Sequence, residues 1–426
     1  MFLLLSLVWV IIFSVEIQHS HGREIPVFYE IKSDEGIATL AGTERCIINI
    51  NEDLGNPQPL LIVPNKSEFY VPQNKIGDIT LQPDEQIELF CSEKFKFPES
   101  ISDTIVVSCI RNSTVLHNKL PIDFKSIKCD TNVYHTTRPT YQLCFNDSYL
   151  IQIGFNVSNG RFLDIIDVCF NTVLETTLYT HHIQMPQNIG FQHSVPRPHF
   201  IRGQYFKKTP HINKLFNKNK QKTIFEQTLG HSNISQYLSD EKKSLFLVRG
   251  HLTPKVDFIF GSQQRATFWL INAAPQWQSF NAGNWERIEQ GVRQLIADRD
   301  LMVNIFTGTY GVLAFNDSDG KSNPIFLFHD QNNNSVVPVP KLFYKIVLDM
   351  NFTSGVALIG ANNPFATIDE IEEEYVVCDD VADQLDWLKW DRKNIVKGYT
   401  YACEVDQFLE VIRHLSINVT NISLLV

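Results

Sequence analysis

The sequence predicts a mixed α+β fold. Short strand-like runs separated by Pro, Asn, Asp and Gly occupy the first third of the chain, up to about residue 150. Strand-like runs then alternate with amphipathic stretches whose apolar residues recur at helical spacing. With 426 residues, 43% of them hydrophobic, the chain can bury one large core or two smaller ones.

The N-terminus is apolar from Phe2 to Val15 and then turns polar up to Gly22. This run is too short to span a bilayer comfortably and is typical of a secretory signal peptide. No later stretch is long and apolar enough to cross a membrane. We therefore expect residues 1–22 to be a signal peptide, and the mature protein to be secreted and extracellular with no membrane partner.

Cysteines and glycosylation sequons also indicate export. An even number of cysteines can form four disulfides, and the absence of a CxxC pair makes a zinc or redox site a weak interpretation. The cysteines are Cys46, Cys91, Cys109, Cys129, Cys144, Cys169, Cys378 and Cys403. Asn-x-Ser/Thr sequons, which predict a glycoprotein, occur at Asn65, Asn112, Asn146, Asn156, Asn233, Asn316, Asn333, Asn351, Asn418 and Asn421.

Residues 23–150 are expected to form a β-rich N-terminal region that carries five of the eight cysteines and no chemistry. Its predicted strands are 46–50, 59–63, 86–90 and 104–108. Residues 151–426 are expected to form the main domain, with strands at 245–248, 266–271, 343–348 and 356–360 and a helix at 381–390. A further helix with one apolar face is marked by Trp285, Ile288, Val292, Leu295 and Ile296.

The charge is unevenly distributed. The formal net charge is −10, yet the tract from Arg197 to Lys222 contains eight Lys or Arg and no Asp or Glu. Residues 369–374 hold part of the acidic excess. A local basic tract can bind phosphates while the whole molecule stays acidic. By itself the tract is equally compatible with a solvated loop.

The segment from Arg249 to Gly291 carries the chemistry. His251 follows a strand-like run, and a histidine can act as general base near neutral pH. Asn281 precedes the amphipathic helix and offers an amide oxygen, a ligand that suits Mg²⁺. Glu289 and Arg293 are four residues apart on one side of that helix. Taken singly, each has a structural interpretation: an exposed or buried histidine, a helix cap and a surface ion pair.

Together these residues resemble a known family. Arg249-Gly250-His251, with Asn272, Asn281, Glu289 and Arg293 at their spacings, is similar to the DNA/RNA non-specific endonucleases, the ββα-metal nucleases with a D-R-G-H signature. Blocks at 307–311, 343–347, 362–365 and 390–392 are similar to the secreted arthropod branch, which includes gut double-stranded ribonucleases and salivary nucleases. The likeness covers roughly residues 150–410. It implies a ββα-metal (His-Me finger) core on a mixed, mainly antiparallel sheet.

The resemblance also implies roles. His251 is expected to be the general base, and Asn281 the single protein ligand of a hydrated Mg²⁺ or Mn²⁺. Glu289 would contact water of that ion, Arg249 and Arg293 would bind phosphate or stabilise the transition state, and Asn272 would support the substrate site. Arg197 or Arg202 is the candidate for an upstream phosphate-binding arginine, and Arg265 is a further substrate-binding candidate.

One position departs from the signature: Val248 stands where the family has Asp. The missing carboxylate removes a support for the turn and leaves both the base and the metal ligand in place. Two functions follow. The first is a secreted, Mg²⁺-dependent endonuclease that cleaves single- and double-stranded DNA and RNA without sequence preference, because it contacts phosphates and not base edges. The alternative is a salivary or gut nucleic-acid-binding protein with weak or residual nuclease activity.

Overall fold

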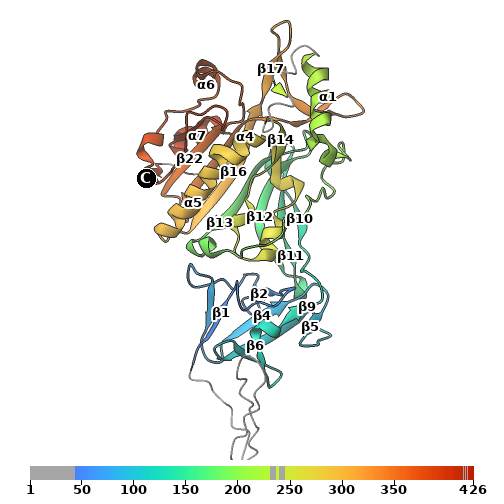
Figure 1. The fold of residues 1–426 in the computed structure, drawn as a ribbon, viewed down its shortest axis with the longest axis vertical. Coiled ribbons are helices and arrows are strands. Elements are labelled where there is room, and N and C mark those ends of the chain that lie inside the picture. The colour runs from blue at the N-terminus through green and yellow to red at the C-terminus, as the bar shows by residue number, and fades with distance from the viewer. Residues whose placement is uncertain (1–43, 231–236, 239–244, 416, 418, 420) are drawn as a thin grey trace, which may run out of the picture. The chain divides into compact units, whose positions relative to one another are not determined.

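A computed structural model of the protein describes residues 44–426 except 231–236, 239–244, 416, 418 and 420 (Figure 1). The predicted signal peptide, residues 1–22, lies outside the described residues. None of the helices in the described ranges is long and apolar enough to cross a membrane.

The N-terminal strands form a five-stranded antiparallel sheet in the order β2-β4-β6-β7-β8, with the pairs β1-β3 and β5-β9 beside it. Disulfides Cys46–Cys109 and Cys91–Cys129 cross-link this region. The four strands predicted here are confirmed as β1, β2, β4 and β6. The bounds are β1 Cys46–Asn49, β2 Leu60–Ile62, β3 Asp78–Leu81, β4 Gln86–Phe90, β5 Phe95–Phe97, β6 Thr104–Arg111, β7 Thr114–His117, β8 Leu120–Asp123 and β9 Lys128–Cys129.

The large sheet has nine strands in the order β10-β11-β12-β13-β16-β21-β22-β23, with β24 beside β22. Every pair is antiparallel except β22-β24, so the predicted mixed, mainly antiparallel sheet is confirmed. The bounds are β10 Thr136–Phe145, β11 Ser148–Asn156, β12 Phe162–Asn171, β13 Thr176–Gln184, β16 Val303–Val312, β21 Pro340–Asp349, β22 Ser354–Ala361, β23 Thr400–Cys403 and β24 Ser423–Leu424.

Strands on both sides of residue 150 belong to this sheet, and the disulfide Cys144–Cys169 also bridges that point. The division of the chain at residue 150 stays a prediction. The fourth disulfide, Cys378–Cys403, joins the segment after α6 to β23. All eight cysteines are therefore paired, as their even number predicted.

Side chains of the central strands alternate between two cores. On β21, Phe343 and Val347 face the core that contains the predicted amphipathic helix, α5. Tyr344 and Ile346 face the opposite core, where α6 and α7 pack. Strands covered on both faces read as apolar runs, which is why β21 and β22 could be predicted from sequence. Figure 1 shows α5 lying along this sheet.

Within the described residues, the helices are few and short apart from α1 and α5. The α-helices are α1 Lys218–Leu229, α3 Gly261–Ala266, α4 Gln278–Phe280, α5 Glu286–Asp298, α6 Ile368–Glu374 and α7 Val405–Val411. The 3₁₀ helices are η1 Phe124–Ser126, η2 Ser158–Gly160, η3 Pro186–Gly190, η4 Ile212–Phe216, η6 Lys255–Asp257, η7 Leu270–Asn272 and η9 Ala382–Gln384, and η8 Asn281–Trp285 is a π turn. The two-stranded pairs are β14 Leu247–His251 with β15 Ala273–Trp277, β17 Ala314–Asn316 with β18 Ser322–Pro324, and β19 Phe326–His329 with β20 Ser335–Pro338.

Two predicted elements are wrong. Residues 266–271 are the end of α3, a turn and η7, and the strand begins only at Ala273. A short apolar run occurs in a buried turn as well as in a strand, and hydrophobic periodicity cannot distinguish the two structures. The predicted helix at 381–390 is the short η9 followed by irregular chain. Its apolar side chains are anchors: a Cβ on Gly291 of α5 would lie 2.5 Å from Leu388 Cδ1, so the chain docks closely there.

Candidate active site

Strands β14 and β15 and helix α5 form the strand–strand–helix unit that holds the motif. The two strands pair antiparallel, with His251 at the end of β14 opposite Ala273 at the start of β15. Gly250 is required because its partner strand lays the Gln276 side chain over it: a Cβ at Gly250 would lie 2.1 Å from Gln276 Oε1. Val248 lies opposite Gln276, whose buried amide has no hydrogen-bond partner among the described residues.

The His251 imidazole is held by aromatic rings. Its centroid lies 4.9 Å from that of Phe200 and 4.8 Å from that of Phe268, and the residue is only 9% exposed. Burial, with the charges of Arg197 and Lys255, lowers the pKa of His251 to about 3. The imidazole is therefore neutral at physiological pH. Its Nε2 is buried and has no hydrogen-bond partner among the described residues.

Asn272 fixes the turn that follows β14. Its Oδ1 accepts from the Thr253 backbone N–H at 2.9 Å, and its Nδ2 donates to the carbonyls of Thr253 and Thr267, each at 2.9 Å. The residue is fully buried. The Asn272 amide is thus occupied by hydrogen bonds within the protein. It has no free polar group left for a substrate contact, and these bonds fit the supporting role instead.

Arg249 extends from β14 and contacts η4. Its Nε donates to Asn213 Oδ1 at 3.1 Å, and its Nη2 donates to the Asn213 carbonyl at 2.7 Å. The guanidinium also lies over the Phe216 ring, 4.6 Å from its centroid. These contacts hold a half-buried cation one residue from Gly250 and two from His251.

The start of α5 presents the predicted metal ligand. Asn281 begins the π turn η8, which contains the non-helical Gly283, and a glycine is needed there because a Cβ would lie 2.6 Å from the Lys397 carbonyl oxygen. Neither Asn281 nor Glu289 makes a side-chain hydrogen bond within the described ranges, and both are partly exposed. Burial raises the pKa of Glu289 to about 7, against the charges of Lys345 and Arg293, which lower it.

Oxygen donors without internal partners fit a hard divalent cation. Within the part of the chain that the structure describes, no three His, Cys, Asp or Glu side chains are grouped so as to hold a metal. An ion bound by Asn281 would therefore have few side-chain ligands and keep most of its water, as Mg²⁺ commonly does.

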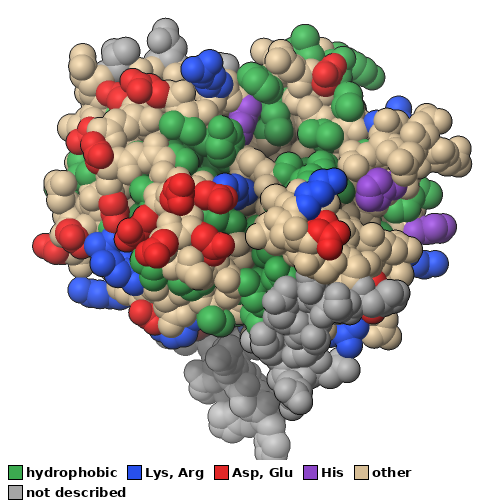
Figure 2. Space-filling model, turned by 90° about the horizontal axis from the view of Figure 1, so that it is seen from above, with side chains coloured by type: hydrophobic (Ala, Val, Ile, Leu, Met, Phe, Trp, Pro, Cys, Tyr) green, Lys and Arg blue, Asp and Glu red, His purple; other side chains and the backbone are tan. Residues whose placement is uncertain are grey.

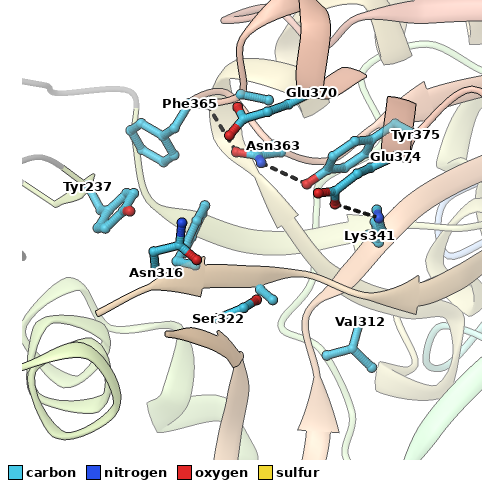
Figure 3. A pocket seen from close by; sticks show the side chains of 13 residues that line it. Tyr237, Val312, Asn316, Ser322, Lys341, Asn363, Phe365, Glu370, Glu374 and Tyr375 are labelled. Atoms are coloured by element: carbon cyan, nitrogen blue, oxygen red, sulfur yellow. Dashed lines mark hydrogen bonds and ion pairs between the residues drawn. The ribbon is translucent and has the colours of Figure 1, made fainter. Parts of the chain in front are cut away.

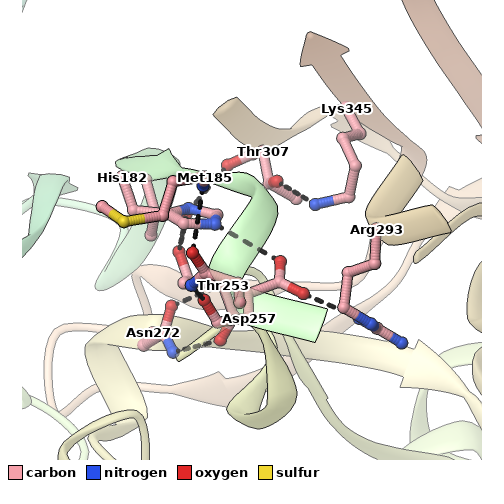
Figure 4. Close-up of polar contacts among 10 residues, drawn as sticks. His182, Met185, Thr253, Asp257, Asn272, Arg293, Thr307 and Lys345 are labelled. Atoms are coloured by element: carbon pink, nitrogen blue, oxygen red, sulfur yellow. Dashed lines mark hydrogen bonds and ion pairs between the residues drawn. The ribbon is translucent and has the colours of Figure 1, made fainter. Parts of the chain in front are cut away.

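Arg293 does not stand free beside these residues. Its Nη1 donates to Asp257 Oδ1 at 2.7 Å, and the other carboxylate oxygen of Asp257 lies 3.3 Å from His182 Nε2 (Figure 4). Burial opposes ionisation of Asp257, but the hydrogen bond from His182 and the charge of Arg293 hold its pKa at about 2. Lys345, 1% exposed, donates to Thr307 Oγ1 at 2.7 Å, and burial lowers its pKa.

His182, Asp257 and Lys345 were not predicted as site residues. Only Lys345 left a signal in the sequence, as a charged residue inside an otherwise apolar strand run, 343–348. Thr253 joins this ionic cluster to the motif, since its Oγ1 lies 3.4 Å from His182 Nδ1 while its backbone is held by Asn272. The ionic cluster is therefore joined through Thr253 to the turn that follows His251.

The other predicted arginines lie in different surroundings. Arg197 is exposed and its guanidinium lies 5.4 Å from the centroid of Phe268, which also contacts His251. Arg202 donates to the Phe206 carbonyl at 3.0 Å and so holds its own loop. Arg265, on α3, is near enough to His135 to lower the pKa of that histidine, and its Nη2 is buried without a partner in the described residues. Of the three, the contacts bring Arg197 nearest to His251.

Figure 3 shows a separate pocket of about 340 Å³. Aromatic and acidic side chains line it, with Lys341 paired to Glu374 at 3.1 Å and Asn363 donating to the Tyr375 hydroxyl at 2.8 Å. None of the predicted site residues lines this pocket. Helix α6 beside it exposes five carboxylates, and Figure 2 shows acidic side chains gathered on this face.

Comparison with known proteins agrees with the motif. Residues 129–408, more than half of the chain, match the DNA/RNA non-specific endonuclease family. The chain belongs to this family, whose members are metal-dependent nucleases acting on nucleic acids. This confirms the predictions that the protein is an enzyme, a hydrolase of phosphodiester bonds, and that it resembles arthropod salivary proteins.

Two relatives illustrate the latter. The chain is 27% identical to a salivary endonuclease of Lutzomyia longipalpis over 88% of this chain and 85% of that protein. It is 26% identical to the salivary protein Tsal2A of Glossina morsitans morsitans over 89% of this chain and 96% of that protein. A crystal structure of an EndoG/EndoGI complex matches with a TM-score of 0.31 and 20% identity, covering 47% of this chain and 72% of that chain.

Proposed function

We propose that the protein is a secreted, Mg²⁺-dependent endonuclease that cleaves DNA and RNA, single- or double-stranded, without strong sequence preference. The observation that carries the proposal is the His251 ring. It is held at the end of β14, neutral, with Nε2 unpartnered among the described residues and an arginine two residues before it. A neutral imidazole with a free nitrogen can take the proton of an attacking water.

The residues around His251 supply the remaining needs of phosphodiester hydrolysis. Arg249 and Arg197 are the cations that hold the phosphate, and the absence of base-reading contacts in such a scheme explains low sequence preference. Asn281 would hold Mg²⁺ through its amide oxygen, and Glu289 would orient water beside it. The ion supplies charge stabilisation for phosphate oxygens in the transition state. Arg293 stabilises Asp257 through the ion pair between them and adds positive charge to the site from its buried position.

The test is a cleavage assay with long double-stranded RNA and plasmid DNA, in Mg²⁺ and in EDTA. His251→Ala should abolish cleavage and leave binding intact within about twofold, because the base touches the attacking water and contributes little to affinity. His193→Ala, at an exposed histidine on a loop, is the matched control. A fully active His251→Ala protein would remove the mechanism.

The metal assignment has its own measurement. Asn281→Ala should weaken Mg²⁺ binding, followed by titration calorimetry on the folded protein, while thermal stability in EDTA stays unchanged. Unaltered Mg²⁺ binding in this variant would place the ion elsewhere. Substituting Mn²⁺ for Mg²⁺ in the same titration tests which of the two ions the amide oxygen accepts.

Two observations favour the second candidate, a nucleic-acid-binding protein with residual cleavage. Phe200 covers His251, and Val248 leaves the buried Gln276 amide without the carboxylate partner that the family signature would place beside it. Tight binding with slow, metal-dependent cleavage would support this candidate. Val248→Asp should then raise the cleavage rate without changing affinity.

Secretion and glycosylation belong to the same proposal. All sequon asparagines within the described residues are exposed: Asn65, Asn112, Asn146, Asn156, Asn316, Asn333, Asn351 and Asn421. Four disulfides are typical of an oxidising, extracellular environment. Expression in insect cells should yield protein in the medium whose mass falls on treatment with a glycan-removing enzyme.

A further inference from the structure

A second groove, of about 680 Å³, lies on the basic tract. We call it the lysine groove. Its walls come from the loop before η4, from η4, from the start of α1 and from β19, and the lining residues are Thr209, Pro210, His211, Asn213, Lys214, Leu215, Asn217, Lys220 and Phe328. Only one of the residues predicted to bind substrate, Arg249, contacts this groove, through Asn213.

The chemistry of the lining points to a polyanion. Lys214, Lys220 and His211 are exposed, and neither lysine forms an ion pair within the described ranges. No Asp or Glu lines the groove, in a protein whose formal net charge is −10. Thr209 is 1% exposed, and its buried hydroxyl has no partner among the described residues. Cations, a free hydroxyl and one aromatic ring, Phe328, are the groups that bind a phosphate–sugar backbone.

The groove is fastened to the strand that carries His251. The buried Gln221 of α1 accepts from the Leu247 N–H and donates to the Leu247 carbonyl, both at 2.8 Å. Asn213, in the groove wall, accepts from Arg249 and lies 3.5 Å from the carbonyl of Phe200, whose ring covers His251. In Figure 1, α1 lies next to β14. A nucleic-acid chain bound in the lysine groove would therefore lie at a fixed position relative to His251.

We propose that the lysine groove binds the phosphodiester backbone of the nucleic acid outside the point of cleavage, as a second contact site for long substrates. The inference rests on the proposed function, since it extends the nucleic acid beyond His251. Arg249 lies between the two sites and would contact the chain as it passes from one to the other. Long polymers therefore bind through both sites, whereas an oligonucleotide of a few residues binds only at His251.

The test is the double variant Lys214→Gln/Lys220→Gln, compared with Lys96→Gln/Lys125→Gln in the N-terminal β-rich region, where both lysines are exposed. Removing one phosphate-binding lysine should reduce the slope of log Kd against log salt by about 1, so the slope of the groove variant should be lower by about 2. At low salt its affinity for long double-stranded RNA or DNA should fall roughly tenfold. The control variant should match the wild type.

Substrate length separates this effect from damage to the active site. The groove variant should cleave a tetranucleotide at the wild-type rate and show a raised KM, with unchanged kcat, only on polymers. Equal loss on both substrates, or an unchanged salt slope, would overturn the inference. So would loss of heparin binding with unchanged nucleic-acid binding, which would assign the groove to a sulfated polysaccharide.

Two controls keep the result distinct from failure of the proposed function. If the wild-type protein neither binds nor cleaves nucleic acid, the proposed function fails and the groove inference fails with it. If the wild type cleaves in a His251-dependent way and the groove variant behaves like its control, only the groove inference fails. A thermal unfolding temperature equal to that of the wild type shows that the variant folds.

Discussion

Two buried histidines of this protein have opposite surroundings. His251 packs against Phe200 and Phe268 with Nε2 unpartnered in the described part of the chain, and no carboxylate is bonded to it. His182 lies against Asp257, which in turn is bonded to Arg293. The first environment keeps the His251 imidazole neutral, while in the second the His182 imidazole is part of an ionic cluster. Both rings are buried, so what separates the two histidines is the carboxylate that lies beside His182.

The largest effect should separate the two histidines. His251→Gln is expected to lower kcat by roughly 10³-fold, because it removes the proposed base. Thermal stability should change little, because no buried group in the described residues is hydrogen-bonded to His251 Nε2 and would be left unpaired. His182→Gln should instead lower the unfolding temperature and reduce kcat by less than about tenfold. Parallel cleavage assays and thermal melts measure both. Equal losses of rate would mean that both rings act in one catalytic unit.

Breaking the cluster at Asp257 tests its structural side. Asp257→Ala leaves Arg293 buried without its carboxylate, and an uncompensated buried charge costs about 3–5 kcal/mol of unfolding free energy. Urea unfolding with the disulfides intact measures this loss. Asp257→Glu keeps the charge and serves as the milder variant if the first does not fold. Wild-type stability in Asp257→Ala would show that the cluster is not held by this carboxylate.

The aromatic cover of His251 predicts a shifted pH profile. The pKa of about 3 keeps the imidazole deprotonated at pH 5, so protonation of His251 should not limit wild-type kcat/KM there; Glu289, whose pKa burial raises to about 7, is the other site group that titrates in this range. Phe200→Ala exposes the ring and should return its pKa toward about 6.5, which reduces activity near pH 5.5 severalfold but not at pH 8. Phe191→Ala, beside the exposed His193, is the control. An unchanged acid limb would place the activity-limiting pKa on another group.

The last prediction concerns stability in acid. Burial lowers the pKa of His135 and His414, each to about 4, as it does for His182 and His251. Since the unfolded chain then takes up protons first, unfolding free energy should fall as pH drops from about 6.5 to 4, by up to about 1.4 kcal/mol per pH unit for each histidine. His414→Gln should flatten this slope by one proton. Urea midpoints across this pH range measure it.

Much of the architecture could be predicted from the sequence because it depends on local chemistry. The four N-terminal strands, the apolar strands β21 and β22 and helix α5 follow from periodicity, and the spacing of the motif from Arg249 to Arg293 is sufficient to indicate the family. The boundaries of β15 and the segment 381–390 could not be predicted in this way. Their apolar residues, such as Leu388, are placed by docking against α5 and not by the period of a helix or strand.

The sequence by itself determined the chemical inventory: a histidine, two asparagines, a glutamate and arginines in fixed order, eight cysteines and a basic tract. Only the tertiary structure decided which of these groups are free and which are occupied. Arg293 is paired with Asp257 and Asn272 is bonded within its own turn, while His251 keeps a nitrogen unpartnered among the described residues and Lys214 and Lys220 face an open groove. Partners such as His182, Asp257 and Lys345 come from β13, η6 and β21, far apart along the chain. Contact between such distant segments depends on how the strands and helices pack, which no local pattern of residues records.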